Sequence, residues 1–180
     1  MNTTPKIVVD IRPMTVSDVA LLEASFPESG SAKHLERFLR QQKGEVVYLI
    51  AMRQGMPAGH ALLKWRGPED KHVAHKLRFA CPDIEDLFVL EELRSQGIGT
   101  QILHFIERLV AEHGYAHIGL SVGVATNERA RLLYERLGYK DGDFGAYLEH
   151  GEYVDAHGQH HTWEENCLYL IKDLESKSIL

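Results

Sequence analysis

The feature that most constrains this chain is a strand-like run that passes through two glycines into a helix-like pattern. The segment is DIEDLFVLEELRSQGIGTQILHFIERL, residues 83–109. Residues 83–89 are typical of a strand, and residues 100–113 have the apolar spacing of an amphipathic helix. Gly97 and Gly99 lie between the two. N–H groups left unpaired at a helix start, with the positive end of the helix dipole, favour an anion. The segment therefore predicts an anion site.

Spacing distinguishes among the phosphate-binding turns that this segment could form. A P-loop requires Lys and then Ser or Thr after the glycine, whereas Gly99 is followed by Thr100 and Gln101. A dinucleotide fingerprint requires a small residue where this chain has Ile102, and an acid at the end of the next strand, where SVGV offers none. The phosphate-binding pattern that is left is Arg94 followed at fixed spacing by Gly-x-Gly. A tight turn that needs only a positive φ, with no ligand, is the alternative.

Composition indicates a single soluble domain over residues 1–180. The chain is 44% hydrophobic and 26% charged, and its net charge of -6 gives no general attraction to nucleic acid or an anionic membrane surface. We find no apolar run of signal-peptide or membrane-spanning length. Cys81 and Cys167 form no paired motif, which suits a reducing compartment. We therefore expect a cytoplasmic protein.

Hydrophobic spacing predicts alternating elements on either side of the glycines. We expect a strand over 7–11, a helix from Thr15 to about Ala24 with Asp18 completing a capping box, a helix over 31–43, strands over 45–52 and 59–65, a polar loop over 66–82, a strand over 117–124, a helix over 127–137 and a last strand over 165–174. Within the helix over 100–113, the predicted core face is Ile102, Leu103, Ile106, Leu109 and Val110. The pattern favours a mixed α/β fold.

Two motifs resemble the GNAT superfamily of acetyl-CoA-dependent N-acetyltransferases. RSQGIG is similar to the family's pyrophosphate loop, and SVGVATNERARLLYERLGYK, residues 121–140, resembles its Asn-x-x-Ala-x-x-x-Tyr-x-x-x-Gly-Tyr helix. The resemblance implies a mixed, mainly antiparallel central sheet flanked by helices, with acetyl-CoA as cosubstrate. The cofactor contacts that it implies are Leu87, Phe88, Val89, Arg94, Ser95, Gln96, Gly97, Ile98, Gly99, Thr100, Asn127 and Ala130.

Acetyl transfer to an amine makes two chemical demands. An alkyl amine with a pKa near ~10.4 is protonated at neutral pH, so freeing its lone pair costs about 4 to 5 kcal/mol and a base helps. A phenol can assist the departing thiolate by donating a proton or a hydrogen bond. Tyr134 shares a helix face with Asn127, and the resemblance places it beside the thioester sulfur. Core packing for Tyr134 and a purely N-capping role for Asn127 remain alternatives.

The acids of the 83–89 strand are the candidates for the base. Strand alternation predicts that Glu85 shares a face with Asp83 and Leu87, while Asp86 points to the other side. EDLFV resembles the diamine branch of the family, whose Glu-Asp pair activates and holds the acceptor. We therefore expect Glu85 to be the base and Asp86 an acceptor contact. A merely solvated Glu85 is the alternative.

Residues 143–166 lengthen the connection before the last strand, and we expect them to shape acceptor specificity with the two N-terminal helices. The acids that favour a cationic acceptor, a polyamine or an aminoglycoside-like sugar, are Asp83, Glu85, Asp86, Asp143, Glu149, Glu152 and Asp155. A zinc site could be built from His157, His160 and His161 with Asp155 or Glu164. Loop histidines without a cysteine set are more often solvated, so we expect no metal.

Two classes of function remain in view. The first is an acetyltransferase acting on a small-molecule amine, with a protein N-terminus, a lysine or an amino acid as other acceptors. The second is a non-catalytic acyl-CoA sensor. A sensor needs only the cofactor loop, and the presence of both Glu85 and Tyr134 favours the enzyme. We expect no nucleic-acid or membrane partner, and the sequence leaves a monomer and a homodimer both open.

Overall fold

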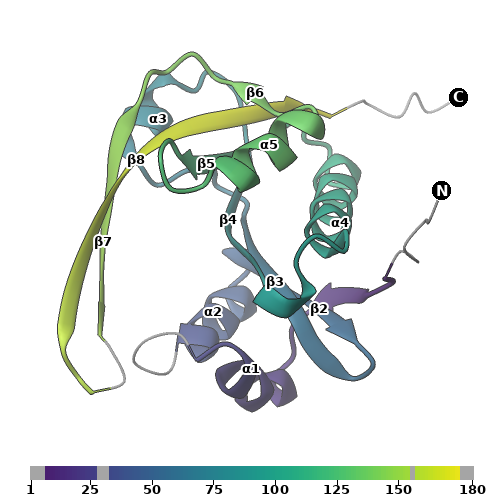
Figure 1. Cartoon of the computed structure of the whole chain (residues 1–180). Helices are drawn as coiled ribbons and strands as arrows, with labels where there is room; N and C mark the ends of the chain where they lie inside the picture. The colour runs from purple at the N-terminus through teal and green to yellow at the C-terminus, as the bar shows by residue number, and fades with distance from the viewer. Residues whose placement is uncertain (1–6, 28–32, 155–156, 175–180) are drawn as a thin grey trace, which may run out of the picture.

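The computed structural model describes residues 7–27, 33–154 and 157–174, and shows one sheet with helices on both faces (Figure 1). The strands are β1 (Asp10–Pro13), β2 (Val46–Arg53), β3 (Met56–Lys64), β4 (Asp83–Val89), β5 (His117–Gly123), β6 (Lys140–Asp141), β7 (Tyr147–Val154) and β8 (His160–Asp173). The helices are α1 (Val19–Ser25), α2 (Lys33–Gln42), α3 (Lys71–Lys76), α4 (Ile98–Glu112) and α5 (Glu128–Arg136), with 3-10 turns at Val16–Asp18 and Glu91–Leu93. None of the helices in these ranges has the length and apolar character needed to cross a bilayer.

The sheet is mixed and mainly antiparallel, as predicted. Its strand order is β1-β2-β3-β4-β5-β8-β6, with β7 paired to β8. Among the strands of the described residues, only β4 and β5 are parallel, because α4 carries the chain back between them. Their pairing is limited to Asp83 with Gly119 and Ile84 with Leu120. Beyond Ile84, β4 pairs with β3 alone, so the carboxyl-terminal parts of β4 and β5 separate.

β4 contains a β-bulge at its middle. Leu62 of β3 pairs with Glu85 and His60 pairs with Phe88, so two steps along β3 match three along β4. Asp86 lies within this bulge, and its φ of 55° is in the left-handed region. A bulge of this kind resets the alternation of side chains along the strand that contains it.

The bulge overturns part of the face assignment made from alternation. Asp83 and Glu85 do share a face, because Lys64 contacts both. Glu85 is opposite Leu62, which belongs to the hydrophobic cluster on the side of α1 and α2. Asp86 reaches α2 on that same side, whereas Leu87 packs into the opposite core, beneath α4. The prediction that Leu87 accompanies Glu85 and that Asp86 points away was wrong, because simple alternation cannot anticipate an inserted residue.

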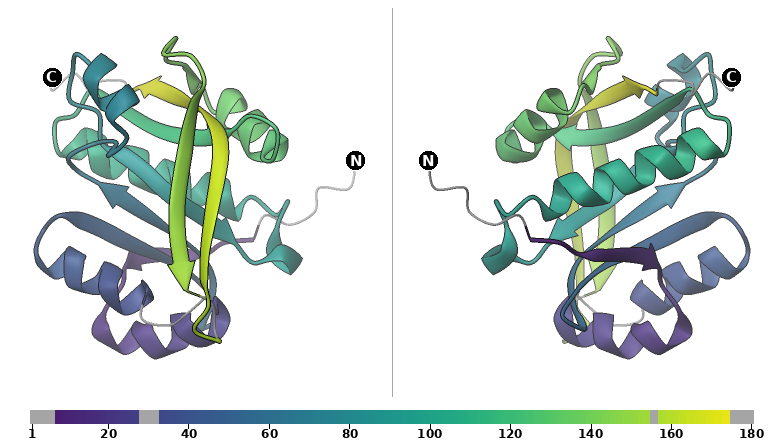
Figure 2. Two further views of the ribbon diagram at one scale, coloured as in Figure 1. Left: turned by 90° about the vertical axis from the view of Figure 1, so that its left-hand side faces the viewer. Right: turned by 90° about the vertical axis from the view of Figure 1, so that its right-hand side faces the viewer.

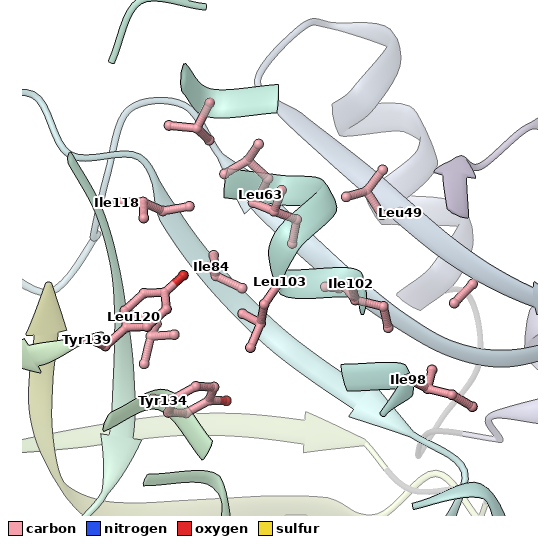
Figure 3. Close-up of a cluster of buried hydrophobic side chains, with 14 of the residues drawn as sticks. Leu49, Leu63, Ile84, Ile98, Ile102, Leu103, Ile118, Leu120, Tyr134 and Tyr139 are labelled. Atoms are coloured by element: carbon pink, nitrogen blue, oxygen red, sulfur yellow. The ribbon is translucent and has the colours of Figure 1, made fainter. Parts of the chain in front are cut away.

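Two hydrophobic layers hold the sheet. Beneath α4 and α5, Ile102, Leu103, Ile106 and Val110 pack against Leu63, Ile84, Ile118 and Leu120 of the strands (Figure 3). This confirms the predicted core face of α4, with Leu109 only half-buried. On the other face, α1 and α2 cover a second cluster of Met14, Leu22, Phe26, Val46, Tyr48, Ile50 and Leu62 (Figure 2).

The N-terminal helices follow the prediction in outline. Thr15 and Asp18 form the expected capping box, and Asp18 also pairs with Arg12 at 2.7 Å. The helix expected from Thr15 divides into a 3-10 turn and α1. The helix predicted over 31–43 appears as α2, and residues 31 and 32 lie outside the described ranges.

Two regions differ from the prediction. The polar loop over 66–82 contains α3, which Asp70 caps by accepting a hydrogen bond from the Val73 N–H at 3.1 Å. The last strand begins at His160 rather than residue 165, and it forms a long hairpin with the unpredicted β7. This hairpin extends past the sheet on the side of α1 and α2 (Figures 1 and 2). It was missed because the hydrophobic residues of β7 occur as two adjacent pairs and do not alternate with polar ones.

Candidate active site

A cleft of about 1670 Å³ lies where β4 and β5 separate, between α2, α3, the start of α4, α5 and the β7–β8 hairpin. The predicted site residues that line it are Glu85, Asp86, Leu87, Phe88, Val89, Arg94, Ser95, Gly97, Ile98, Gly99, Thr100, Asn127, Ala130 and Tyr134. Gln96 is the exception, because its side chain turns back to donate to the Glu92 carbonyl at 3.0 Å. The topology thus brings residues 85–100 together with residues 127–134, which lie further along the sequence.

The glycine loop presents main-chain donors to this cleft. Gly97 is the N-cap of α4, with φ 82° and ψ 6°, and Ser95 also has a positive φ of 63°. A Cβ added at Gly97 would meet nothing within 4 Å, so the glycine is required by its backbone conformation and not by crowding. The first helical hydrogen bond runs from Gln101 N to Gly97 O, at 3.1 Å. The N–H groups before Gln101 have no partner within the helix and can serve an anion.

Two arginines frame the loop. Arg94 Nε donates to the Val89 carbonyl at 3.0 Å, and its guanidinium lies 5.3 Å from the Phe88 ring centre. Arg129 reaches from α5 to donate to the Ser95 hydroxyl. Sequence reasoning missed Arg129, because it occupies a variable position of the helix motif and only the fold shows its direction. Main-chain donors, a helix start and two cations together fit a pyrophosphate.

Asn127 occupies the N-cap of α5 without capping it through its side chain. Only its carbonyl takes part, accepting from Arg131 N at 2.9 Å. The exposed side-chain amide is therefore free to face the cleft, which weakens the purely capping alternative. Ala130, one turn further on, is half-buried and lines the same wall.

Tyr134 belongs to both the core and the cleft. Its ring is 8% exposed and lies 6.0 Å from the Tyr139 ring (Figure 3), yet Tyr134 also lines the cleft. Burial raises the pKa of Tyr134 to about 12. None of the described residues hydrogen-bonds its hydroxyl. A phenol in this setting is better suited to donating a hydrogen bond than to giving up its proton.

Lys64 links two acids at the start of β4. Its Nζ lies 3.1 Å from Asp83 Oδ2 and 2.6 Å from Glu85 Oε2. The Asp83 side chain is 7% exposed and that of Glu85 is 45% exposed. Burial raises the pKa of Asp83 to about 6, against the opposing effect of the Lys64 ammonium. All three line the cleft, and Glu85 is the most exposed member of this group.

Asp86 is matched by cations of α2. Its carboxylate pairs with Arg37 and lies 3.7 Å from Lys33 Nζ. Arg37 is itself buried and also donates to the Tyr48 hydroxyl at 3.3 Å. The negative charge of Asp86 is thus largely balanced within the protein.

The inner face of the hairpin carries a like-charged pair. Glu149 of β7 stands directly opposite Glu165 of β8, and both line the cleft beside Trp163. The Tyr147 hydroxyl donates to Glu149 Oε1 at 3.2 Å. Within the described ranges, no lysine or arginine pairs with either glutamate. Directly opposed like charges destabilise a strand pair, so this arrangement favours a cation from outside.

Other acids of the extended tail are placed differently. Asp143 and Glu152 do not line the cleft, and Asp155 lies outside the described residues. Among the histidines, the His161 ring stacks on Tyr153 at 5.0 Å. Over residues 7–27, 33–154 and 157–174 no group of three or more His, Cys, Asp or Glu is arranged to hold a metal ion. Glu165, which sequence reasoning did not single out, is the acid that the register brings into the cleft.

Comparison with known proteins gives this geometry a family. Residues 18–139 match the model of the acetyltransferase (GNAT) family. An N-acetyltransferase from Staphylococcus aureus Mu50 superposes with a TM-score of 0.68 at 15% identity, over 93% of this chain and 99% of that one. The ribosomal-protein-S18-alanine N-acetyltransferase from Escherichia coli gives 0.63 at 16%, over 96% and 99%. A GNAT family acetyltransferase from Elizabethkingia anophelis, with acetyl-CoA bound, gives 0.58 at 19%, over 92% and 98%.

These solved structures establish the fold. The family match begins at Asp18, the end of the first 3-10 turn, and ends at Tyr139, three residues after α5. The match is to the family as a whole and not to its diamine branch. It covers the bulged strand, the glycine loop and the Asn127–Tyr134 face described above. The chain belongs to the acetyltransferase (GNAT) family and is an acetyl-CoA-dependent N-acetyltransferase.

Proposed function

We propose that this protein transfers the acetyl group of acetyl-CoA to a primary amine of a small cationic acceptor. The observation that carries the proposal is that a single cleft joins the glycine loop, Tyr134 and Glu85. Each supplies one requirement of acetyl transfer: a seat for the pyrophosphate, a donor near the leaving sulfur, and a carboxylate open to the acceptor.

The distribution of charge along the cleft supports this division of labour. At the end formed by the loop and α5, the charged lining residues are Arg94, Arg129, Arg136 and Glu128. At the other end, the acids Glu69, Asp70, Asp83, Glu85, Asp86, Glu149 and Glu165 outnumber the cations Lys33, Arg37, Lys64 and Lys71. An anionic cosubstrate suits the first end, and a cationic acceptor suits the second.

The cofactor end would hold acetyl-CoA through its main chain. The loop over residues 95–100 and the start of α4 would receive the pyrophosphate, with Arg94 and Arg129 beside it and Asn127 and Ala130 on the facing wall. The edge of β4 at Leu87, Phe88 and Val89 has no β5 partner, so its main-chain groups can meet the pantetheine and the thioester carbonyl. The cosubstrate supplies an activated acetyl thioester.

At the acceptor end, Glu85 would accept a proton from the ammonium, directly or through water, and free the nitrogen lone pair. The nitrogen then forms a bond to the acetyl carbon while the carbon–sulfur bond breaks. The second proton that the nitrogen loses goes to the departing thiolate, which leaves as the free thiol. Complete proton transfer from Tyr134, with its pKa of about 12, to a thiolate near ~8.5 would be uphill by roughly 5 kcal/mol. We therefore assign Tyr134 a hydrogen bond to the departing sulfur.

The hairpin glutamates would contribute to acceptor binding. A second ammonium near Glu149 and Glu165 would relieve their mutual repulsion, each carboxylate contributing on the order of 1 kcal/mol where solvent screens it. Asp86 has a smaller part here, because Arg37 and Lys33 already balance its charge. A polyamine or an aminoglycoside-like amino sugar meets these requirements better than a neutral amino acid.

A screen of amines with acetyl-CoA, read by release of free thiol, tests the proposal. Monoamines, diamines and polyamines of matched length are compared with amino acids and with a short peptide that has a free N-terminus, at two salt concentrations. We expect kcat/KM to rise with acceptor charge and this preference to weaken with salt. A preference for the peptide, or one indifferent to charge, would overturn the cationic acceptor. Acetyl-CoA binding without turnover of any amine would point instead to a sensor.

A further inference from the structure

Lys64, the buried lysine at the end of β3, does not itself exchange a proton with the acceptor. Lys64 pairs with Asp83 across the β3–β4 ladder, and Glu85 is opposite Leu62, two residues along on the same face. Residues in such a diagonal position lie within reach of a long side chain. The strand register therefore directs the Lys64 ammonium to both carboxylates, at the distances given above.

Behind Lys64, the group is anchored on its buried side. The Tyr169 hydroxyl donates to Asp83 Oδ1 at 3.0 Å, while Lys64 occupies Asp83 Oδ2. Both oxygens of Asp83 are thus engaged, and its side chain has little room to turn. Burial alone would lower the pKa of Lys64, but the charges of Asp83 and Glu85 and the hydrogen bonds to both raise it above its ordinary value. Lys64 is a fixed cation, not a proton donor.

On the cleft side, Glu85 uses Oε2 to meet Lys64, and its side chain is the most exposed of the group. Other charges face this part of the cleft. Lys33 and Arg37 are matched to Asp86, residues 69–71 contribute Glu69, Asp70 and Lys71, and Glu149 and Glu165 stand on the hairpin. Acids predominate among these charges, and Lys64 is the cation within the described residues that contacts Glu85 directly.

We propose that Lys64 is a positioning residue for acetyl transfer, which fixes the Glu85 carboxylate at the cleft and holds a positive charge directly beside it. The proposal rests on the assignment of Glu85 as the base. When Glu85 takes the proton from the acceptor, an N–H bond breaks and an O–H bond forms, while Lys64 neither gains nor loses a proton. Asp83 and Tyr169 act one step further back, by holding Lys64.

The test compares pH profiles of kcat/KM with acetyl-CoA and 1,4-diaminobutane in the wild type, Lys64→Met and Lys64→Arg. Removing the cation should move the acid limb of the profile to higher pH by about one unit and lower kcat roughly tenfold. Lys64→Arg keeps the charge and should restore most of the wild-type profile. Lys43→Met removes an exposed cation that does not line the cleft, so its acid limb should stay in place.

Lys64→Met leaves Asp83 buried without its cation, which threatens folding. The double variant Lys64→Met/Asp83→Asn removes that buried charge while Tyr169 keeps an acceptor, and it should show the same displaced acid limb. A folded single or double variant with the wild-type profile would overturn the role of Lys64.

Glu85→Gln separates this inference from the proposed function. If Glu85→Gln retains the wild-type rate and acid limb, then Glu85 is not the base and the role of Lys64 fails with it. If Glu85→Gln loses activity while Lys64→Met leaves the profile unchanged, the inference about Lys64 fails alone. A wild type that acetylates neither 1,4-diaminobutane nor any amine of the screen removes the proposed function itself.

Discussion

The two ends of the cleft are specified by the sequence in different ways. The cofactor end is assembled from two short segments, the loop between β4 and α4 and the first two turns of α5. The acceptor end draws side chains from α2, β3, the start of α3, β4 and the β7–β8 hairpin. The first end depends on backbone conformation, and the second on which distant residues the sheet places side by side.

They also differ in how they manage charge. At the cofactor end the charged side chains that line the cleft are exposed, and the main chain provides much of the anion site. At the acceptor end, buried or half-buried carboxylates are paired with Lys64 and Arg37, and two further glutamates oppose each other unpaired. We infer that the cofactor end tolerates changes of pH and salt better than the acceptor end does.

The largest expected effect concerns buried charge at the acceptor end. Burial raises the pKa of Asp83 to about 6, above its value near ~3.9 in an unfolded chain. Protonated Asp83 stabilises the fold, and this contribution is fully present below the pKa of Asp83 in the unfolded chain. It is lost as pH rises through the folded pKa of about 6. Relative to the wild type, Asp83→Asn should therefore gain unfolding free energy between pH 4 and 7.5, by at most ~3 kcal/mol.

Urea unfolding at several pH values measures this difference. Glu128→Gln, an exposed charge change at the cofactor end, is the matched control, and Asp83→Asn should differ from it by the larger dependence on pH. Equal pH dependence in the two variants would remove the electrostatic contrast between the two ends.

The next effect tests whether Tyr134 serves chemistry or only packing. Tyr134→Phe keeps the ring and removes the hydroxyl, so kcat should fall by about 10²-fold with little change in acetyl-CoA affinity. Tyr139→Phe removes a hydroxyl from the neighbouring ring, which is buried and does not line the cleft. Steady-state kinetics of both variants should show a loss only for Tyr134→Phe, and equal losses would assign the tyrosine to the core.

The difference between the two ends explains how much the sequence could predict. The strand, glycine loop and helix were correctly placed because their signals are contiguous and each follows from local geometry, as does the capping box of Thr15 and Asp18. The core face of α4 was predictable for the same reason. The family match now supports the fold and the acetyltransferase activity.

What the sequence could not provide depends on contacts between distant segments. The bulge at Asp86 reverses the expected direction of two side chains, and no local signal announces it. Likewise, the pairing of Glu149 with Glu165 follows from the register of the β7–β8 hairpin. The Arg129–Ser95 contact requires α5 to lie over the loop. Such features follow from tertiary structure, which single-sequence patterns do not encode.

A third prediction concerns the backbone of the cofactor loop. Gly97→Val should raise the dissociation constant of acetyl-CoA at least tenfold, about 1.4 kcal/mol, because valine resists the left-handed φ that presents the N–H groups. Gly114, at the other end of α4, has a φ of 85° and equally open surroundings. Gly114→Val should therefore cost similar stability while calorimetry finds acetyl-CoA affinity unchanged. Equal affinity in both variants would contradict the pyrophosphate assignment.

The smallest effect separates binding from stability at the acceptor end, because the same change should act on the two in opposite directions. Glu149→Gln or Glu165→Gln removes the repulsion between directly opposed carboxylates and should raise unfolding free energy by roughly 0.2 to 1 kcal/mol. It should also lower kcat/KM for diamines about three- to fivefold at low salt, while a monoamine changes less.

Glu152→Gln makes the same chemical change on β7 at a residue that does not line the cleft, opposite Thr162. It should alter neither unfolding free energy nor acceptor preference beyond error. Removing the charge of Glu149 both relieves the repulsion and deletes a contact for the acceptor. A Glu149 variant that gains stability should therefore also lose preference for the second ammonium. Stabilisation without any change in the ratio of diamine to monoamine kcat/KM would mean that the pair faces only solvent, and the acceptor end would then discriminate through Glu85 alone.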